Sequence, residues 1–180
     1  KELGLNQPLP LQFITYMGDL IRGDLGSSLR TKQPVLQGIL SHLPASLELM
    51  LLSILLALLG GLFLGVISAY KENTLIDHIG RTASVACVSV PSFWLAMVLQ
   101  IIFFKLLGIL PVGGRIDTLV DIVSPIQNIT GFYLLDSLIT GNWQAFTSSI
   151  HHLLLPAMTL AAYSLGLISR MTRATMLEIY

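Results

Sequence analysis

The chain has 180 residues, of which 53% are hydrophobic and only 11% are charged, and its mean hydropathy is +0.76. Soluble domains carry about 25% charged residues, so this composition indicates a protein built for lipid rather than for water. Ten basic and ten acidic residues cancel, which excludes a nucleic-acid surface based on net charge. A single cysteine, Cys87, excludes an internal disulfide framework.

The first quarter of the chain, residues 1–45, mixes polar and apolar residues and is interrupted by glycines and prolines. Apolar residues of Pro10–Ile21 recur at helical spacing on one face, which predicts a short amphipathic helix. The segment Gln33–Leu43 predicts a second one, with Pro34 in a first helical turn, where proline is tolerated. Neither is long enough to cross a bilayer, so we expect both at the membrane surface or packed on the helix bundle.

The stretch Leu49–Ala69 is the clearest membrane signal, because it contains no charge, proline, asparagine or glutamine. At about 1.5 Å per residue, a helix of this length extends over about 31 Å, close to the hydrocarbon thickness of a bilayer. Ser46, just after Pro44, has the features of a helix N-cap. The sequence therefore predicts a first membrane-spanning helix over residues 46–70.

Three glycines in this span, Gly60, Gly61 and Gly65, lie on one helical face. Small residues let a second helix approach closely in lipid, so we predict that they form a helix-packing surface. Glu48 is the carboxylate nearest to the membrane. An acid at this depth is a candidate for a role in transport, and the alternative is that it faces water at the membrane edge.

A polar loop over residues 70–81 is predicted between the first span and a second span over residues 82–105. Within this loop, Asp77 and His78 are expected to form a solvated pair rather than a proton relay. Pro91 lies near the middle of the second span. Because it removes one backbone hydrogen bond and clashes with the preceding turn, it predicts a kink there.

The region 106–150 begins with a glycine-rich turn and continues as a loop of weak pattern, in which Phe132–Ile139 predicts a short interfacial helix. A third span is predicted over residues 151–169, with Pro156 in its first turns. Residues 172–180 predict the start of an amphipathic helix on the water side.

Motifs for catalysis or metal binding are not found in the sequence. There is no Gly-rich phosphate loop, no Gly-x-Ser-x-Gly and no His-Glu-x-x-His. The histidines are His42, His78, His151 and His152. Adjacent positions on a helix point about 100° apart, so the last two cannot easily share a metal. We therefore predict no catalytic residue and no metal site.

Seven short motifs in a fixed order carry a family resemblance. They are LGLNQPL at 3–9, GDLGSSL at 23–29, LPASLEL at 43–49, VPSFWLAM at 90–97, LPVGGR at 110–115, LLPAMTL at 154–160 and SRMTRATMLEIY at 169–180. The ordered set resembles the inner-membrane permease subunits of bacterial ABC importers for dipeptides and oligopeptides. Nickel and glutathione permeases are close relatives, and the stretch NITGFYLLDSLITGNW is most similar to the dipeptide branch.

The resemblance implies an all-α membrane protein, a fragment of a type I ABC importer permease with three transmembrane helices and short periplasmic amphipathic helices. It implies that residues 1–45 are a periplasmic segment after a first transmembrane helix missing from this sequence, and that residues 46–180 are part of the permease transmembrane domain. Residues 106–150 would then face the periplasm, whereas 71–81 and 170–180 would face the cytoplasm. A cytoplasmic coupling helix and two further spans would follow the last residue.

The implied function is that of a multi-pass permease in the bacterial cytoplasmic membrane, forming part of the translocation path for dipeptides or oligopeptides. Its expected partners are a second permease subunit, two ATPase subunits, a periplasmic peptide-binding protein and membrane lipid, with no nucleic acid. ATP and Mg²⁺ would bind the ATPase subunits, so we expect no cofactor and no enzyme activity on this chain. The alternatives are a nickel or glutathione permease of the same family and a non-transporting membrane scaffold subunit.

Under this resemblance, Pro91, Ser92, Phe93 and Trp94, together with Glu48, are predicted to face the translocation path. A proline-broken helix is tolerated where it lines a cavity or packs on protein. The alternative is that Phe93 and Trp94 simply pack between helices.

A second set, Arg170, Arg173 and Glu178, is predicted to lie near the side where the ATPase subunits couple. The alternative for the two arginines is a plain anchoring role at the membrane edge.

Overall fold

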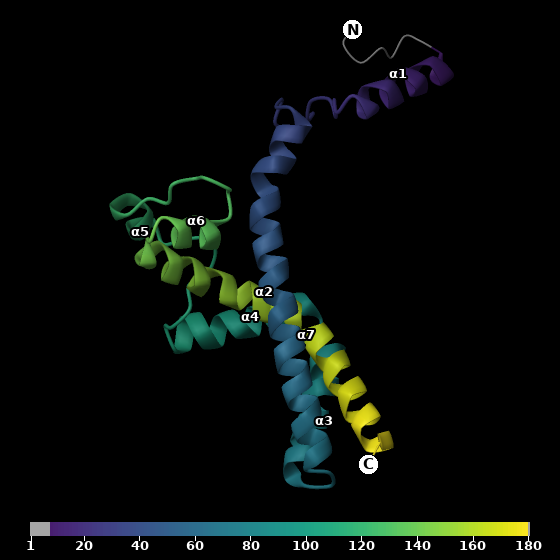
Figure 1. Cartoon of the computed structure of the whole chain (residues 1–180), viewed down its shortest axis with the longest axis vertical. Helices are drawn as coiled ribbons and strands as arrows, with labels where there is room; N and C mark the ends of the chain where they lie inside the picture. The colour runs from purple at the N-terminus through teal and green to yellow at the C-terminus, as the bar shows by residue number, and fades with distance from the viewer. Residues whose placement is uncertain (1–7, 180) are drawn as a thin grey trace. The chain divides into compact units, whose positions relative to one another are not determined.

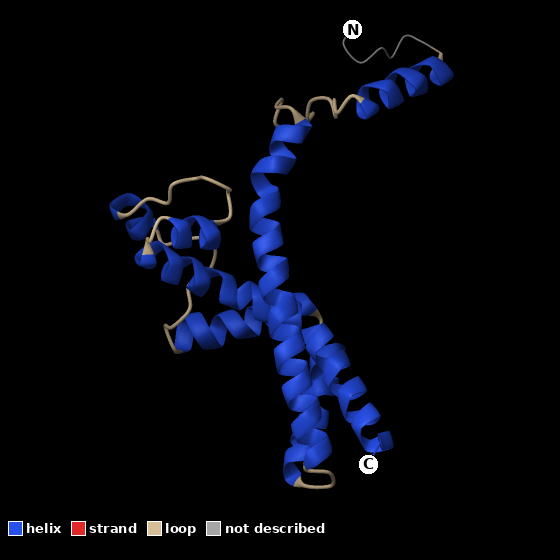
Figure 2. Cartoon of the chain, viewed as in Figure 1, coloured by secondary structure: helices blue, strands red, loops and turns tan. Residues whose placement is uncertain are grey.

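The computed structural model describes residues 8–179, and the chain divides into two compact units, Lys1–Pro44 and Ala45–Tyr180. The regular elements of the described residues are helices, apart from one isolated bridge between Ser27 and Pro34 (Figure 2). The prediction of an all-α fold is therefore confirmed.

The first unit contains helix α1 (Leu9–Ile21), which confirms the helix predicted over Pro10–Ile21. Gly23 follows the helix with a φ of +83°, a conformation that glycine adopts without steric cost and that commonly ends a helix. None of the residues of α1 is buried. The motif quoted for residues 3–9 lies mostly outside the described residues.

Helix α2 (Val35–Tyr70) is longer than predicted, because it continues through Pro44. The separate short helix expected over Gln33–Leu43 and the N-cap expected at Ser46 are therefore wrong. Apolar residues continue at helical spacing on both sides of the proline. Propagation of the helix from both sides outweighs the local cost of one missing N–H.

The polar loop expected over residues 70–81 is shorter in the structure, because helix α3 (Leu75–Ser89) begins inside it. A tight turn connects α2 to α3, with Asn73 at a φ of +59° and Thr74 at the N-cap position. Asp77 consequently lies in the first turn of a helix rather than in a solvated loop.

The expected second span, residues 82–105, is broken rather than kinked. It continues as helix α4 (Ser92–Leu99) and the π-helix η1 (Gln100–Leu106), and this second part is bent by 115° from α3. Val90 is extended, with φ −82° and ψ 129°, as the residue before a proline prefers. The helix therefore ends before Pro91 instead of bending through it.

Two short helices, α5 (Thr118–Val123) and α6 (Tyr133–Ile139), precede the long helix α7 (Trp143–Ile179). Helix α6 falls within the predicted interfacial segment. Helix α7 joins the predicted third span and the predicted tail helix into one element that passes through Pro156. The tail thus continues a membrane-length helix instead of starting a new one.

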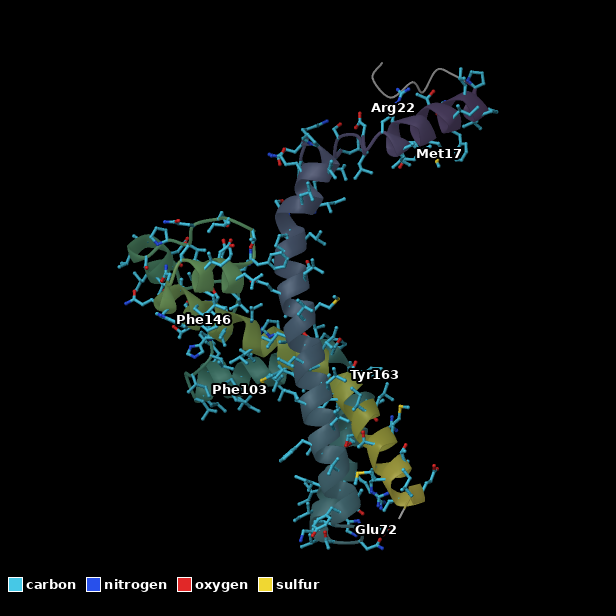
Figure 3. The ribbon with its side chains drawn as sticks, in the orientation of Figure 1. Met17, Arg22, Glu72, Phe103, Phe146 and Tyr163 are labelled. Carbon is cyan, nitrogen blue, oxygen red and sulfur yellow. The ribbon has the colours of Figure 1, made fainter. Side chains whose placement is uncertain are left out.

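The second unit packs through small residues. Helices α2 and α7 are each long and apolar enough to cross a membrane, and the bent pair makes a third crossing if it is one span. Helices α3 and α4 lie against α7 (Figure 1). The buried apolar residues are largely alanines, such as Ala57, Ala145, Ala157 and Ala161. Large side chains, Tyr163 among them, project outward (Figure 3), a distribution typical of helices that pack in lipid.

Candidate functional site: two ion-pair clusters in the helix bundle

The first cluster is centred on Glu48 of α2. Its carboxylate accepts a hydrogen bond from Arg115 Nη2 at 2.7 Å and another from the backbone N–H of Leu134 at 2.7 Å. The Glu48 side chain is only 4% exposed, so the alternative that it faces water is wrong. Burying a carboxylate is costly unless both of its oxygens find donors, and here each oxygen has one.

Arg115 makes three different contacts in this cluster. Besides Glu48, it donates to the carbonyl of Gly131 at 3.1 Å and lies over the ring of Tyr133, 3.6 Å from the ring centroid. A guanidinium combines a charged hydrogen bond with aromatic stacking better than an ammonium does. We call Glu48, Arg115, Gly131, Tyr133 and Leu134 the Glu48 cluster. It fastens the loop before α5 and the start of α6 to α2.

A buried carboxylate inside α6 shapes the loop that serves this cluster. Asp136 is fully buried and accepts hydrogen bonds from the backbone N–H groups of Ile129, Thr130 and Gly131 and from the Thr130 hydroxyl. Burial raises the pKa of Asp136, but these hydrogen bonds outweigh it and hold the pKa below its ordinary value. The ionised Asp136 thereby fixes the Gly131 carbonyl that Arg115 uses.

The second cluster is centred on Asp77 of α3. Arg173 of α7 forms a two-pronged pair with it, through Nε at 2.7 Å and Nη2 at 2.8 Å. Ser68 of α2 donates its hydroxyl at 2.5 Å, and the backbone N–H of Asn73 donates at 3.2 Å. We call Ser68, Asn73, Asp77 and Arg173 the Asp77 cluster. It joins α2, α3 and α7 at one level.

Asp77 has no exposed side-chain surface, so the expectation of a solvated Asp77–His78 pair is wrong. Because α3 begins at Leu75, the Asp77 carboxylate points toward the end of α2 and toward α7 rather than into a loop. Four hydrogen bonds replace the water that the carboxylate loses. The pair is therefore well satisfied despite its burial.

The separation of the two clusters matches a membrane. Glu48 and Ser68 lie about 20 residues apart on the same helix, which corresponds to about 30 Å along its axis. The hydrocarbon core of a bilayer has about this thickness. The clusters thus neutralise buried charges at the two edges of the apolar part of α2.

Between the clusters, glycines bring α2 and α7 together. A Cβ atom at Gly61 would lie 2.8 Å from Ile168 Cβ, and one at Gly65 would lie 2.7 Å from the Ser169 carbonyl oxygen. At Gly60 the nearest atom is the flexible Cδ1 of a leucine side chain, at 2.8 Å. The three glycines predicted from the sequence therefore all lie against α7.

Helices α3 and α7 approach just as closely. A Cβ at Gly166 would lie 2.5 Å from the Ser84 carbonyl oxygen, and the Ser84 hydroxyl donates to the Ser169 hydroxyl at 3.0 Å. Interhelical hydrogen bonds and small residues are the usual means of helix association in lipid.

The remaining predicted site residues, apart from Arg173, are at the surface. Pro91, Ser92, Phe93 and Trp94 are exposed at the start of α4, and they are not among the residues of the Glu48 cluster. Their role in a translocation path stays a prediction. The same holds for the roles of the exposed Arg170 and Glu178 and for that of Arg173, which the structure places in the Asp77 cluster. Within residues 8–179, no three His, Cys, Asp or Glu side chains converge as metal ligands.

The sequence shows the charged residues of the two clusters but not which of them pair with one another. Arg115 was recognisable only as part of a turn motif, and its partner lies 67 positions away. The partners Asp77 and Arg173 are separated by 96 positions. A charged residue next to an apolar span is a signal that a partner exists, but spacing does not say which residue that partner is.

Long helices with exposed apolar side chains, joined through glycines and with their charges paired at two levels a membrane apart, define a helical membrane protein. Residues 61–180 match the family described as binding-protein-dependent transport system inner membrane component, and the chain belongs to this family. The description of this family supports a place in the bacterial inner membrane for the chain.

Relatives with assigned names match almost the whole chain. A probable D,D-dipeptide transport system permease protein of Escherichia coli (strain K12) is 46% identical over 99% of this chain and 52% of its own length. A di/tripeptide transport system permease protein of Pseudomonas aeruginosa is 43% identical over 98% of this chain and 52% of its own. A dipeptide transport system permease protein of Alkalihalophilus pseudofirmus is 41% identical over 99% of this chain and 53% of its own.

The resemblance to peptide permeases that the motifs predicted is thus confirmed. The chain spans about half the length of these relatives.

Proposed function

We propose that the chain is part of the permease subunit of an ATP-driven importer that carries dipeptides or oligopeptides across the cytoplasmic membrane. The observation that carries the proposal is the 46% identity, over 99% of the chain, to a permease named for D,D-dipeptide transport. Other relatives are named for dipeptides and for di- and tripeptides. Their names favour peptides over nickel or glutathione as the substrate class of this chain.

The proposal includes partners and a division of labour. The family is defined by its dependence on a binding protein, which supports a periplasmic peptide-binding protein as the source of substrate. A second permease subunit would complete the path, and two ATPase subunits would bind ATP and Mg²⁺ and hydrolyse the nucleotide. The contribution of this chain is a shaped, membrane-spanning wall rather than a chemical step.

In this arrangement the chain crosses the membrane several times, with the Glu48 cluster on the periplasmic side and the Asp77 cluster on the cytoplasmic side. The geometry suits this role because a permease must change shape without exposing unpaired charge to lipid. Each cluster keeps its ionised groups hydrogen-bonded to one another. The ends of the helices would then move as joined units while the path between them opens and closes.

The test is transport by the complete importer. The full-length permease, its partner permease, the two ATPases and the binding protein would be reconstituted in proteoliposomes and supplied with a labelled dipeptide. We expect uptake that requires both ATP and the binding protein and that unlabelled dipeptide competes, whereas nickel and glutathione do not. ATP-driven uptake of nickel or glutathione without dipeptide uptake would overturn the proposed substrate. No ATP-driven uptake of any of the three would favour the scaffold alternative.

A further inference from the structure

A groove runs between α2 and α7 in the apolar part of the second unit. It has a cavity volume of about 600 Å³, and Ser46, Ser53, Ala57, Ala161 and Ser164 are among its lining residues. We call it the α2–α7 groove. Its walls combine aliphatic side chains with three serines and carry no formal charge.

A second cavity of about 370 Å³ adjoins this groove, because Leu49 and Leu160 line both. Its polar side chains are Gln100 at the start of η1, with His152 and Thr159 of α7. Pro156 also lines it. Since proline has no N–H, the carbonyl four residues before it lacks its helical donor. The two cavities together carry a series of polar groups on α2, η1 and α7, with no Asp, Glu, Lys or Arg among their lining residues.

Ser164 lies deep between the two clusters, where a polar side chain indicates a function. The neighbouring Leu165 meets Gly60, which lies about 12 residues, or about 18 Å, along α2 from Glu48. Ser164 is therefore near the middle of the apolar distance between the two clusters. Its hydroxyl is exposed and has no hydrogen-bond partner among residues 8–179, and neither has the exposed Gln100 amide.

Exposing an unpaired polar group to the hydrocarbon core of a membrane costs free energy. Such groups therefore normally face a hydrogen-bond partner or a water-filled cavity. A transported peptide presents N–H and C=O groups along its backbone, whatever its side chains. Hydroxyl and amide groups can donate to and accept from such a backbone, whereas a charged lining would favour one class of side chain. The groove therefore fits a peptide backbone better than it fits an ion.

We propose that the α2–α7 groove and the cavity beside Gln100 form one wall of the path along which the peptide backbone crosses the membrane. This inference rests on the proposed function and adds the residues and the recognition chemistry. It assigns the path to the face of α2 that carries Ser53 and the face of α7 that carries Thr159 and Ser164, with Gln100 of η1 beside them. The prediction from the sequence placed the path at Pro91–Trp94 instead.

Cysteine accessibility in the complete importer tests the proposal. In a Cys87→Ser background, Ser164→Cys and Gln100→Cys each place one thiol on the proposed wall. Leu55→Cys is the control, because Leu55 is exposed in the apolar part of α2 but is not a lining residue of the groove. Each variant would first be checked for ATP-driven dipeptide uptake and then treated with a membrane-impermeant methanethiosulfonate in proteoliposomes.

We expect both wall thiols to be modified, transported dipeptide to slow their modification at least threefold, and the Leu55→Cys thiol to stay unmodified. If Ser164→Cys and Gln100→Cys import dipeptide but are not modified, other helices cover the groove and the proposal is wrong, while the proposed function stands. Modification that dipeptide does not slow would also overturn it. If the background protein imports no dipeptide, the proposed function itself fails. Should one wall variant not assemble, the other decides.

Discussion

The Glu48 and Asp77 clusters each neutralise a buried carboxylate with an arginine, at the two edges of the apolar part of α2, but they do so to different degrees. Asp77 has no exposed surface and receives both prongs of Arg173, a hydroxyl and a backbone N–H. Glu48 receives one prong of Arg115 and one backbone N–H, and Arg115 itself remains 28% exposed. The Asp77 cluster joins three helices, whereas the Glu48 cluster fastens a loop and the start of α6 to one helix.

This difference follows from what surrounds each pair. Gly65 brings α7 into close contact with α2 beside Ser169 and Thr172, and the Asp77 carboxylate next to them has no exposed surface. Arg115 lies on a turn, and its guanidinium is shared among a carboxylate, a carbonyl and a ring. We therefore expect the Asp77 cluster to be rigid and costly to break, and the Glu48 cluster to be more tolerant.

The largest effect is expected on removing Arg173. Arg173→Ala leaves the Asp77 carboxylate buried without its cation, a situation that costs about 3–5 kcal/mol. Thermal and denaturant unfolding of the full-length permease in detergent would measure the loss. Arg170→Ala, three residues earlier at an exposed position, is the matched control and is expected to change stability by less than about 0.5 kcal/mol. Equal effects of the two substitutions would contradict the role of the Asp77 cluster.

A smaller effect is expected from filling the glycine contact next to the Asp77 cluster. Gly65→Ala places a Cβ 2.7 Å from a backbone oxygen and from Thr172 Cβ, and such overpacking costs about 1–3 kcal/mol. Gly60→Ala meets only the flexible end of a leucine, so it should cost clearly less. The same unfolding measurement would compare the two variants, and a Gly60→Ala variant as unstable as Gly65→Ala would show that the contact is not the cause.

In the Glu48 cluster, Arg115→Ala is expected to cost about 1–2 kcal/mol, because Glu48 keeps the N–H of Leu134 and partly exposed pairs contribute less than buried ones. Hydrogen exchange of the amides over residues 129–135 should speed up, while the amides near Asp77 stay protected. Arg115→Lys keeps the charge but loses the planar stacking on Tyr133, so its effect should be intermediate. Faster exchange near Asp77 would mean that the two clusters are not independent.

The smallest effect is a pH dependence confined to the loop beside the Glu48 cluster. Because the pKa of Asp136 is held below its ordinary value of 3.8, its ionised form stabilises the folded state. This contribution is fully present above the ordinary value and is lost as the pH falls through the lowered pKa. The difference in stability between the wild type and Asp136→Asn should therefore be constant from pH 7 to about pH 5 and shrink below about pH 4. A difference that grows on acidification would contradict the assignment.

Hydropathy and turn signals predict much of this fold but not its breaks or its pairings. The apolar length of Leu49–Ala69, the amphipathic α1 and the short α6 follow from local patterns. The continuation of α2 through Pro44 does not follow from a local pattern. The local free-energy cost of the proline there is outweighed by helix formation on both sides of it. At Pro91 the preceding residue instead adopts an extended backbone and the helix breaks. The same residue type thus gives opposite outcomes.

Only some residues of the candidate site could be predicted from the sequence. Glu48, Arg173 and the three glycines were recognisable as membrane-edge charges and as a small-residue face. Their partners Arg115 and Asp77 were not, since a pairing across 67 or 96 positions is decided by how the helices pack. The hydrogen bond from Ser68 to Asp77 spans only nine positions, but it depends on the turn that sets α3 against the end of α2.

The most direct test of the account is on which side of the membrane each cluster lies. In the full-length Cys87→Ser permease, Ile129→Cys would report on the Glu48 cluster and Glu72→Cys on the Asp77 cluster, because both positions are exposed beside their clusters. An impermeant thiol reagent would be applied to right-side-out and to inverted membrane vesicles. We predict labelling of Ile129→Cys only in right-side-out vesicles and of Glu72→Cys only in inverted ones. Labelling of both from the same side would contradict a chain whose two clusters lie about one bilayer thickness apart.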